Sequence, residues 1–296
     1  MTNVGVVGLG DMGSGLAKNL IKNKFNTIGL DLSKKRMEDF KRMGGVVAHS
    51  LSDVGKFADI VFVMVMNGNQ AKEVIINKDG LIHSLKKNST VIITATIKPL
   101  EAKQIGDAMK DTEINIIDSP VSGGFPGAQN GTLTMMAAGE KNVLKKCNSV
   151  MQAVSKTIHH VGIKSGEGQT VKACLQSLIG SIFSATFEAA ALAAKAGVKG
   201  ETLFNVFSTS GAGCGVTNTA LENIIDRKFF GTGSSISTMH KDLTIALDLA
   251  ENLGVPLHTA STAMQLFHAG KTKYPDGDNW VVTKVIEEII GAELHR

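Results

Sequence analysis

The sequence has little net charge, few cysteines and no long apolar run, and each shortage excludes a class of protein. Its 296 residues include 31 Lys and Arg against 27 Asp and Glu, which leaves a net charge of +4. A charge this small argues against nucleic acid binding through a basic surface. No stretch approaches the roughly 18 consecutive apolar residues of a membrane helix, and the N-terminus lacks the basic region of a signal peptide. We therefore expect a cytoplasmic protein with no nucleic acid partner and no membrane association.

Cysteine and glycine usage narrows the class further. Cys147, Cys174 and Cys214 are too few and too dispersed for a disulfide framework or a zinc site, so we expect no metal and a reducing compartment. Hydrophobic residues make up 43% of the chain, enough to bury a core. Glycine accounts for 32 of 296 residues, about 11% against roughly 7% on average, and is clustered. Clustered glycines indicate tight turns and close approach of the backbone to a ligand.

Short apolar segments alternate with helical ones over the first half of the chain. Val4–Gly8 and Thr27–Asp31 are predicted strands on either side of a helix over Met12–Lys22. Asp59–Val65 is apolar at nearly every position, which is typical of a sheet covered on both faces. This alternation predicts an α/β fold with a doubly wound parallel sheet of the Rossmann type. Further strands are expected at Val91–Thr94, Ile114–Ile117, Leu133–Ala138 and Thr157–Val161.

The pattern changes near Gly162, after which no strand pattern follows. Gly168–Ala196 contains one interior glycine and no proline, and predicts a helix of about 28 residues, roughly 42 Å long. A helix so long and apolar is expected to be buried, in its own chain or against a second subunit. We predict one domain over residues 1–163 and an all-α domain over residues 164–296. Shorter helices are expected at Glu201–Ser208, Asn218–Asp226, Lys241–Asn252, Thr259–Ala269 and Trp280–Ile290.

A glycine-rich turn, Gly8-Leu9-Gly10-Asp11-Met12-Gly13, joins the first predicted strand to the first predicted helix. Gly8 would permit the tight turn, Gly10 the approach of the backbone to a pyrophosphate, and Gly13 close packing of the helix on the strand. The unpaired amides at the helix N-terminus favour an anion there. The pattern predicts that residues 1–163 bind a dinucleotide.

Asp31 ends the second predicted strand, where a carboxylate can bind the ribose hydroxyls of the cofactor. A carboxylate at this place repels the 2′-phosphate of NADP and favours NAD. The segment Ser33-Lys34-Lys35-Arg36 is an opposing signal because it could bind a phosphate, although such a run more often forms a solvated face. We therefore expect NAD, with NADP as the alternative.

Two later segments contain residues suited to catalysis. In Asp118-Ser119-Pro120-Val121-Ser122-Gly123-Gly124, the Ser122 hydroxyl and the amides of Gly123 and Gly124 could bind a carboxylate, although a structural turn is an equal interpretation. Lys172 is expected near the start of the long helix, where the helix dipole and a bound NAD⁺ would favour the neutral amine that a general base requires. Gln176, four residues later, shares its helix face.

Four motifs in this order resemble those of the β-hydroxyacid dehydrogenase family, which includes 3-hydroxyisobutyrate dehydrogenase, tartronate semialdehyde reductase and threonate dehydrogenases. The resemblance covers nearly the whole chain and implies a Rossmann domain, an all-α substrate and dimerisation domain, and a homodimer or homotetramer. The motifs are Val7–Gly13, Asp118–Gly124 with the glycines up to Gly131, Gly166-x-Gly168-x-x-x-Lys172, and His240-Lys241-Asp242-Leu243.

The resemblance implies roles for individual residues. Lys172 is the catalytic lysine, and Ser122, Gly123 and Gly124 bind the substrate carboxylate. Gln176 orients the reacting hydroxyl or an adjacent oxygen of the substrate.

Three further positions are implied to contact the cofactor. Lys241 matches a late lysine near the nicotinamide, and Thr96 matches a hydroxyl residue at the same end. Val65-Met66-Asn67 stands where the family has a cofactor-contacting turn, which makes Asn67 a cofactor residue.

Two departures from the family pattern affect the substrate. Leu175-Gln176 replaces an Asn usually followed by Asn or Gln, so one amide ligand is absent, and Ser210-Gly211-Ala212-Gly213 replaces Ser-Gly-Arg-Ser. These losses argue against 3-hydroxyisobutyrate itself. Lys172-x-x-x-Gln176, together with the segment 65–70, is more similar to the threonate dehydrogenase branch.

These features predict an oxidoreductase that transfers a hydride between a small hydroxy acid, of threonate or 3-hydroxyisobutyrate type, and NAD, with Lys172 as general acid and base. An NADPH-dependent aldehyde or semialdehyde reductase, of the glyoxylate or succinic semialdehyde type, is one alternative. A non-catalytic NAD-binding module is another, but the presence of Lys172, Thr96 and Lys241 argues against it.

Overall fold

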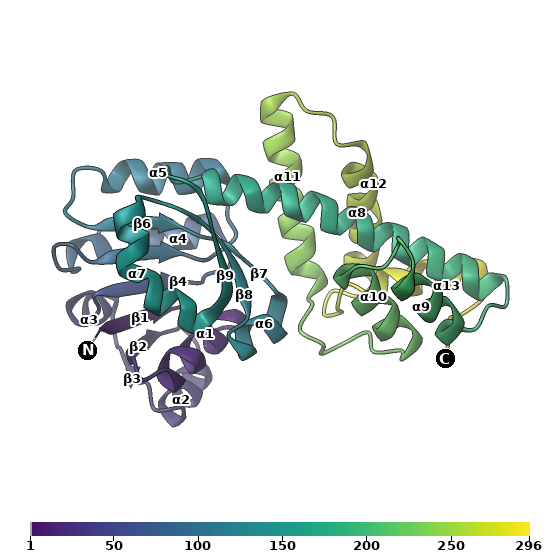
Figure 1. Cartoon of the computed structure of the whole chain (residues 1–296), viewed down its shortest axis with the longest axis horizontal. Helices are drawn as coiled ribbons and strands as arrows, with labels where there is room; N and C mark the ends of the chain where they lie inside the picture. Colours follow the sequence, from purple (N-terminus) through teal and green to yellow (C-terminus); the bar gives the residue numbers. More distant parts are fainter. Residues whose placement is uncertain (1) are drawn as a thin grey trace. The chain divides into compact units, whose positions relative to one another are not determined.

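The structure is a computed structural model that describes residues 2–296 (Figure 1). The chain forms two compact units, the first ending at Lys172 and the second beginning at Ala173. Helix α8 (Glu167–Lys195) contributes its first turns to the first unit and the rest of its length to the second. The domain limits expected at residues 163 and 164 remain a prediction.

The described part of the first unit contains a nine-stranded sheet in the order β3-β2-β1-β4-β5-β6-β8-β7, with β9 paired to β8. The strands from β3 to β6 are all parallel, whereas β8 runs antiparallel to β6 and β7. The parallel part has the strand order of the Rossmann fold, which confirms the predicted fold class. The strands are β1 (Asn3–Val7), β2 (Asn26–Leu30), β3 (Val46–Val47), β4 (Ile60–Val63), β5 (Thr90–Ile93), β6 (Asn115–Asp118), β7 (Val121–Ser122), β8 (Leu133–Ala138) and β9 (Ser155–Gly162).

Each face of this sheet is covered by helices with its own apolar core. Val4 and Val6 of β1 belong to the core with α1, α6 and α7, whereas Val7 belongs to the core with α3, α4 and α5. The alternation follows from the period of two residues in a strand. The helices are α1 (Asp11–Lys22), α2 (Lys34–Arg42), α3 (Leu51–Phe57), α4 (Gly68–Ile75), η1 (Leu81–His83), α5 (Pro99–Met109), α6 (Gly124–Asn130) and α7 (Lys141–Val154).

Helix α8 has 29 residues and begins and ends within one residue of the predicted bounds. Within residues 2–296 it is the one helix long and apolar enough, by length and composition, to cross a membrane, although polar residues interrupt its apolar ones. An interior helix of a soluble protein meets the same criterion, and 44% of its most apolar window is buried here.

The second unit is helical across its described residues, apart from an isolated bridge between Ser235 and Asp278. Its core contains a group of aromatic side chains. The Phe183 ring stacks on the Phe187 ring with 5.8 Å between ring centroids, and it meets the Trp280 ring edge-on with 5.6 Å between centroids. The helices after α8 are α9 (Gly200–Thr209), α10 (Gly215–Ile225), α11 (Ile236–Leu253), α12 (His258–Lys273) and α13 (Val281–Ile290).

Candidate active site

The glycine-rich turn connects β1 to α1, and its conformation depends on the absence of a Cβ atom at its glycines. A Cβ atom on Gly8, which has a φ of +90°, would lie 2.2 Å from the carbonyl oxygen of Met64. A Cβ on Gly13 would lie 1.8 Å from the carbonyl oxygen of Gly8. The nearest atoms to a Cβ on Gly10 are 3.8 Å away, in the Arg36 guanidinium. Gly8 and Gly13 are therefore required by packing, whereas Gly10 keeps open the space before the first amides of α1.

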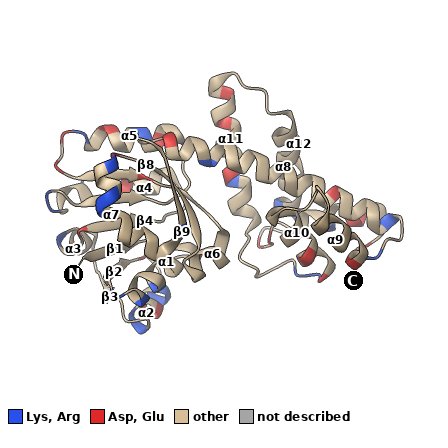
Figure 2. Cartoon of the chain, in the orientation of Figure 1, with Lys and Arg blue, Asp and Glu red and all other residues tan. Residues whose placement is uncertain are grey.

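Asp31, just after β2, is hydrogen-bonded to the backbone of this turn. Its carboxylate accepts hydrogen bonds from the amides of Leu9 at 2.7 Å and Ser33 at 2.8 Å. Arg36 Nη1 lies 3.6 Å from the same carboxylate, so one member of the basic run reaches this position. The basic residues of α2 appear as blue segments of that helix in Figure 2. The turn, the N-terminus of α1, where Gly10 supplies no side-chain cap, and the adjacent carboxylate together fit a dinucleotide.

Asn67 is the N-cap of α4, where its side chain accepts a hydrogen bond from the amide of Gln70 at 2.9 Å. This local bond accounts for an Asn at the position, and the cofactor contact implied by the resemblance remains a prediction.

A buried cluster connects the ends of β5 and β6 with the start of α8. The Asp118 carboxylate accepts hydrogen bonds from the amide of Gly166 at 2.8 Å and from Gln169 Nε2 at 2.8 Å. The Gln169 side chain also bonds the backbone of Ala95 and Ile97, which flank Thr96. Burial raises the pKa of Asp118 from 3.8 to about 6, although these hydrogen bonds oppose the shift.

Lys172 follows on the same helix and is buried. The start of α8 can approach the sheet because residue 168 is glycine: a Cβ there would lie 2.6 Å from the carbonyl oxygens of both Asp118 and Met136. Gly168 thus fixes how closely the helix turn that leads to Lys172 packs on β6 and β8.

The segment from Ser122 to Gly124 forms an open turn between β7 and α6. Gly123 has a φ of +127° and Gly124 a φ of +59°, conformations that side chains rarely adopt. Both glycines are exposed, and the nearest atom to a Cβ on Gly124 is 3.8 Å away. The turn therefore has open space beside both glycines, and the binding of a substrate carboxylate by their amides remains a prediction.

In the second unit, Asp242 contacts two of the predicted site residues. Gln176 Nε2 donates to Asp242 Oδ2 at 2.6 Å, and Lys241 Nζ lies 2.9 Å from Asp242 Oδ1. The Asp242 and Gln176 side chains are both buried. Because a carboxylate oxygen accepts hydrogen bonds, this contact turns the NH₂ group of Gln176 toward Asp242. The Gln176 Oε1 atom is then left to accept a hydrogen bond from another group.

Asp242 and Gln169 were given no role by the sequence analysis. Asp242 stood inside the fourth motif, and Gln169 inside the third, so the motifs marked the segments without indicating which side chains organise them.

Comparisons with known proteins identify the family. Residues 3–162 match the family model described as the NAD binding domain of 6-phosphogluconate dehydrogenase, and residues 166–286 match that described as NAD-binding of NADP-dependent 3-hydroxyisobutyrate dehydrogenase. L-Threonate dehydrogenase of Escherichia coli K12 is 31% identical over 97% of this chain and 95% of its own. The chain belongs to the β-hydroxyacid dehydrogenase family. It is an NAD(P)-dependent oxidoreductase of hydroxy acids.

Other family members share the whole length. 2-(Hydroxymethyl)glutarate dehydrogenase of Eubacterium barkeri is 28% identical over 98% of this chain and 97% of its own. The crystal structure of 3-hydroxyisobutyrate dehydrogenase from Salmonella typhimurium superposes with a TM-score of 0.87 at 30% identity, covering 96% of this chain and 100% of that one. Both units of this β-hydroxyacid dehydrogenase therefore have counterparts in its relatives.

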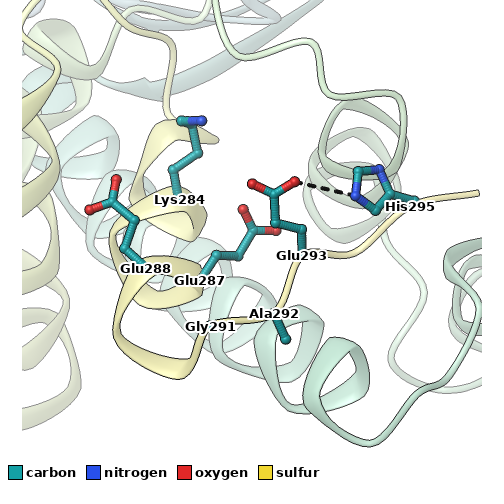
Figure 3. Close-up of a pocket in the computed structure, with 7 residues that line it drawn as sticks. All are labelled: Lys284, Glu287, Glu288, Gly291, Ala292, Glu293 and His295. Atoms are coloured by element: carbon teal, nitrogen blue, oxygen red, sulfur yellow. Dashed lines mark ion pairs between the residues drawn. The ribbon is translucent and has the colours of Figure 1, made fainter.

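A surface hollow of about 380 Å³ lies near the C-terminus and contains none of the predicted site residues (Figure 3). Two of its carboxylates have basic partners: Glu287 pairs with Arg227, outside the lining, at 2.6 Å, and Glu293 lies 3.3 Å from His295. These pairs hold the C-terminal segment. Across residues 2–296, no three His, Cys, Asp or Glu side chains lie together as a metal site.

Proposed function

We propose that this protein oxidises a small polyhydroxylated acid of the L-threonate type, with NAD⁺ as the hydride acceptor. The observation that carries the proposal is the orientation of Gln176, whose amide is held by Asp242 at 2.6 Å with its oxygen left to accept. A substrate with an additional hydroxyl can donate to that oxygen, whereas the methyl group of 3-hydroxyisobutyrate cannot. The L-threonate dehydrogenase relatives, at 31% identity over 97% of the chain, support the same substrate class.

The residues of the first unit supply binding and proton transfer. Ser122 and the amides of Gly123 and Gly124 bind the substrate carboxylate, which places the hydroxyl-bearing carbon. Lys172 accepts the hydroxyl proton in oxidation and returns it in reduction. NAD⁺, when bound, would supply the hydride acceptor for the same carbon.

The cofactor is held by the Gly8–Gly13 turn and by Asp31, which binds the ribose hydroxyls. Thr96 and Lys241 would contact its nicotinamide end, and Asn67 would contact it from the turn before α4. Because Asp31 would repel a 2′-phosphate, NAD is preferred. Arg36, half-exposed beside that carboxylate, is the observation that favours the alternative, an NADPH-dependent semialdehyde reductase.

The enzyme is further proposed to be a cytoplasmic homodimer or homotetramer. Large apolar side chains are exposed on α8 of the single chain, with Leu178 at 58% and Leu192 at 73%. Exposure of such residues on one helix is typical of a subunit interface.

Absorbance of NADH tests the proposal. Purified protein is incubated with NAD⁺ or NADP⁺ and a panel containing threonate and erythronate isomers, 3-hydroxyisobutyrate, glycerate, tartrate and 4-hydroxybutyrate. We expect NADH formation with a four-carbon sugar acid and at least roughly tenfold lower kcat/KM with 3-hydroxyisobutyrate. Preference for 3-hydroxyisobutyrate would contradict the substrate, and a strong preference for NADP⁺ would contradict the cofactor.

A further inference from the structure

We propose that Gln169 is the main positioning residue of this active site: its side-chain amide holds the Thr96 loop, the end of β6 and the first turns of α8 in a single arrangement. The inference deepens the proposed function, on which the roles of Thr96 and Lys172 rest. Gln169 is 1% exposed and does not need to touch substrate or cofactor to act in this way.

Every hydrogen-bonding group of the Gln169 amide is used. Nε2 donates to the carbonyl oxygen of Ala95 at 3.0 Å and to Asp118 Oδ1 at 2.8 Å. Oε1 accepts from the amide of Ile97 at 3.0 Å. The Gln169 side chain thus provides two donors and one acceptor, and its partners provide two acceptors and one donor. Among side chains, only the amide group of Gln or Asn supplies this combination.

These partners lie beside the residues proposed to do the chemistry. Ala95 and Ile97 flank Thr96, so one amide fixes both sides of that residue. Asp118 is the last residue of β6, immediately before the segment that leads to Ser122 and its two glycines. Lys172 lies three residues after Gln169, about one turn along α8. Displacement of a catalytic group by about 1 Å can cost roughly a hundredfold in rate, so this connection matters for catalysis.

Backbone hydrogen bonds complete the connection from the helix side. The amides of Gly166 and Gln169 both donate to Asp118 Oδ2, at 2.8 Å and 3.2 Å. The start of α8 is therefore bonded to the end of β6 through Asp118, and to the segment after β5 through the Gln169 side chain. Buried and satisfied networks of this kind rigidify the elements they join.

The first test replaces Gln169 by Leu, which retains bulk and removes all three side-chain hydrogen bonds. We expect kcat to fall about tenfold to a hundredfold and the Kd for NADH to rise by about threefold to tenfold. Thr170→Val is the matched control on the next residue, because among the contacts described the Thr170 hydroxyl bonds only the carbonyl oxygen of Gly166, the residue before α8, at 2.8 Å. The control should keep kcat and Kd within about twofold of the wild type.

The second test, Gln169→Glu, keeps the shape and gives a signature that lost packing would not produce. It places a carboxyl group against Asp118, so the two groups must share one proton. At about pH 5.5 the protonated carboxyl can donate as the amide did, whereas at about pH 8 both groups tend to ionise and repel. The ratio of variant to wild-type kcat/KM should therefore fall by about tenfold across this pH range.

Adding Asp118→Asn to the Gln169→Glu chain removes the paired carboxylates and should abolish this pH dependence. The amide introduced at position 118 can donate to the carboxylate introduced at position 169, although the bond to Ala95 is not restored, so rescue of the rate should be partial. A pH-independent ratio for Gln169→Glu alone would overturn the proposal. So would activity and NADH affinity within about threefold of the wild type for Gln169→Leu.

Hydrogen exchange separates this inference from the proposed function. The Ile97 amide is bonded to Gln169 Oε1, so its exchange should accelerate in Gln169→Leu and remain slow in Thr170→Val. This readout and NADH affinity require no turnover. If no hydroxy acid is oxidised, the function fails while the exchange result still decides the role of Gln169. Unchanged exchange at Ile97 would refute that role.

Discussion

The cofactor turn and the Gln169 cluster lie in the same unit of the molecule but are built by opposite means. The turn between β1 and α1 works through side chains that are missing, since a Cβ on Gly8 or Gly13 would meet backbone oxygen at 2.2 Å or 1.8 Å. The cluster works through side chains that are present and fully bonded, Gln169 and Asp118. The glycine-rich turn, the first design, is local and is determined by backbone sterics. The Gln169 cluster, the second design, joins segments that are distant in the chain through buried polar groups.

Substitution of two glycines in the turn would break the first design in two different ways. Gly13→Ala should lower the free energy of unfolding by about 3 kcal/mol or more, because its Cβ would lie 1.8 Å from the carbonyl oxygen of Gly8. Gly10→Ala should leave stability nearly unchanged, because its Cβ meets only Arg36, at 3.8 Å, yet weaken NADH binding by about tenfold. Denaturation and NADH titration of both variants test this. Equal stability losses would contradict the distinction.

The pH dependence of stability would test the second design. The pKa of Asp118 is raised from 3.8 to about 6 by burial, so ionisation of its carboxyl opposes folding. The protonated Asp118 carboxyl therefore makes a stabilising contribution that is fully present below pH 3.8. This contribution is lost as the pH rises through about 6, and the loss amounts to about 3 kcal/mol of unfolding free energy. The unfolding free energy of the wild type minus that of Asp118→Asn should fall by most of this amount between about pH 4 and pH 7. Hydrogen exchange at β6 can follow it, and a difference that stays constant with pH would refute it.

Asp242 extends the comparison to the second unit, where a buried carboxylate again orients an amide. Asp242→Asn should raise the KM for L-threonate by about tenfold, because the Gln176 amide can then turn and present its NH₂ group. The kcat/KM for 3-hydroxyisobutyrate should change by less than about threefold. Glu251→Gln, at an exposed carboxylate on the same helix, is the control with smaller effects. Equal losses on both substrates would contradict a specificity role.

Substitution of Arg36 tests the cofactor preference of the glycine-rich turn, and its expected effect is smaller than those above. Arg36→Ala should lower kcat/KM for NADP⁺ by about fivefold to tenfold and change that for NAD⁺ by less than about twofold, because only NADP⁺ carries a 2′-phosphate. Lys35→Ala, exposed on the same helix, is the matched control. Parallel losses with both cofactors would contradict the assignment.

The sequence predicted the part of the site that local rules encode. The Gly8–Gly13 turn follows a strand and opens a helix, and each glycine has a steric reason that can be stated before the structure is known. The same holds for α8, whose 29 residues follow from its composition. The two-residue strands β3 and β7 escaped prediction because so short a segment has no periodicity.

The polar clusters could not be predicted because their partners are distant in the chain. Gln169 bonds residues 51 and 72 positions away, and Gln176 and Asp242 are 66 positions apart. Hydrophobic patterning does not specify which buried polar groups meet, since that depends on how the elements pack. Motif resemblance indicated Lys172 and Gln176 as candidate site residues, but it indicated neither Asp242, which bonds Gln176, nor Gln169, which lies one helix turn before Lys172.

The most direct test of the account compares Lys172→Ala with the wild type in NADH formation from NAD⁺ and L-threonate. We expect turnover to fall at least roughly a hundredfold, the scale of general acid–base catalysis, with the Kd for NADH within about threefold. Lys146→Ala, an exposed lysine on α7, should behave as the wild type. Near-normal turnover in Lys172→Ala would contradict the central claim that this lysine moves the substrate proton.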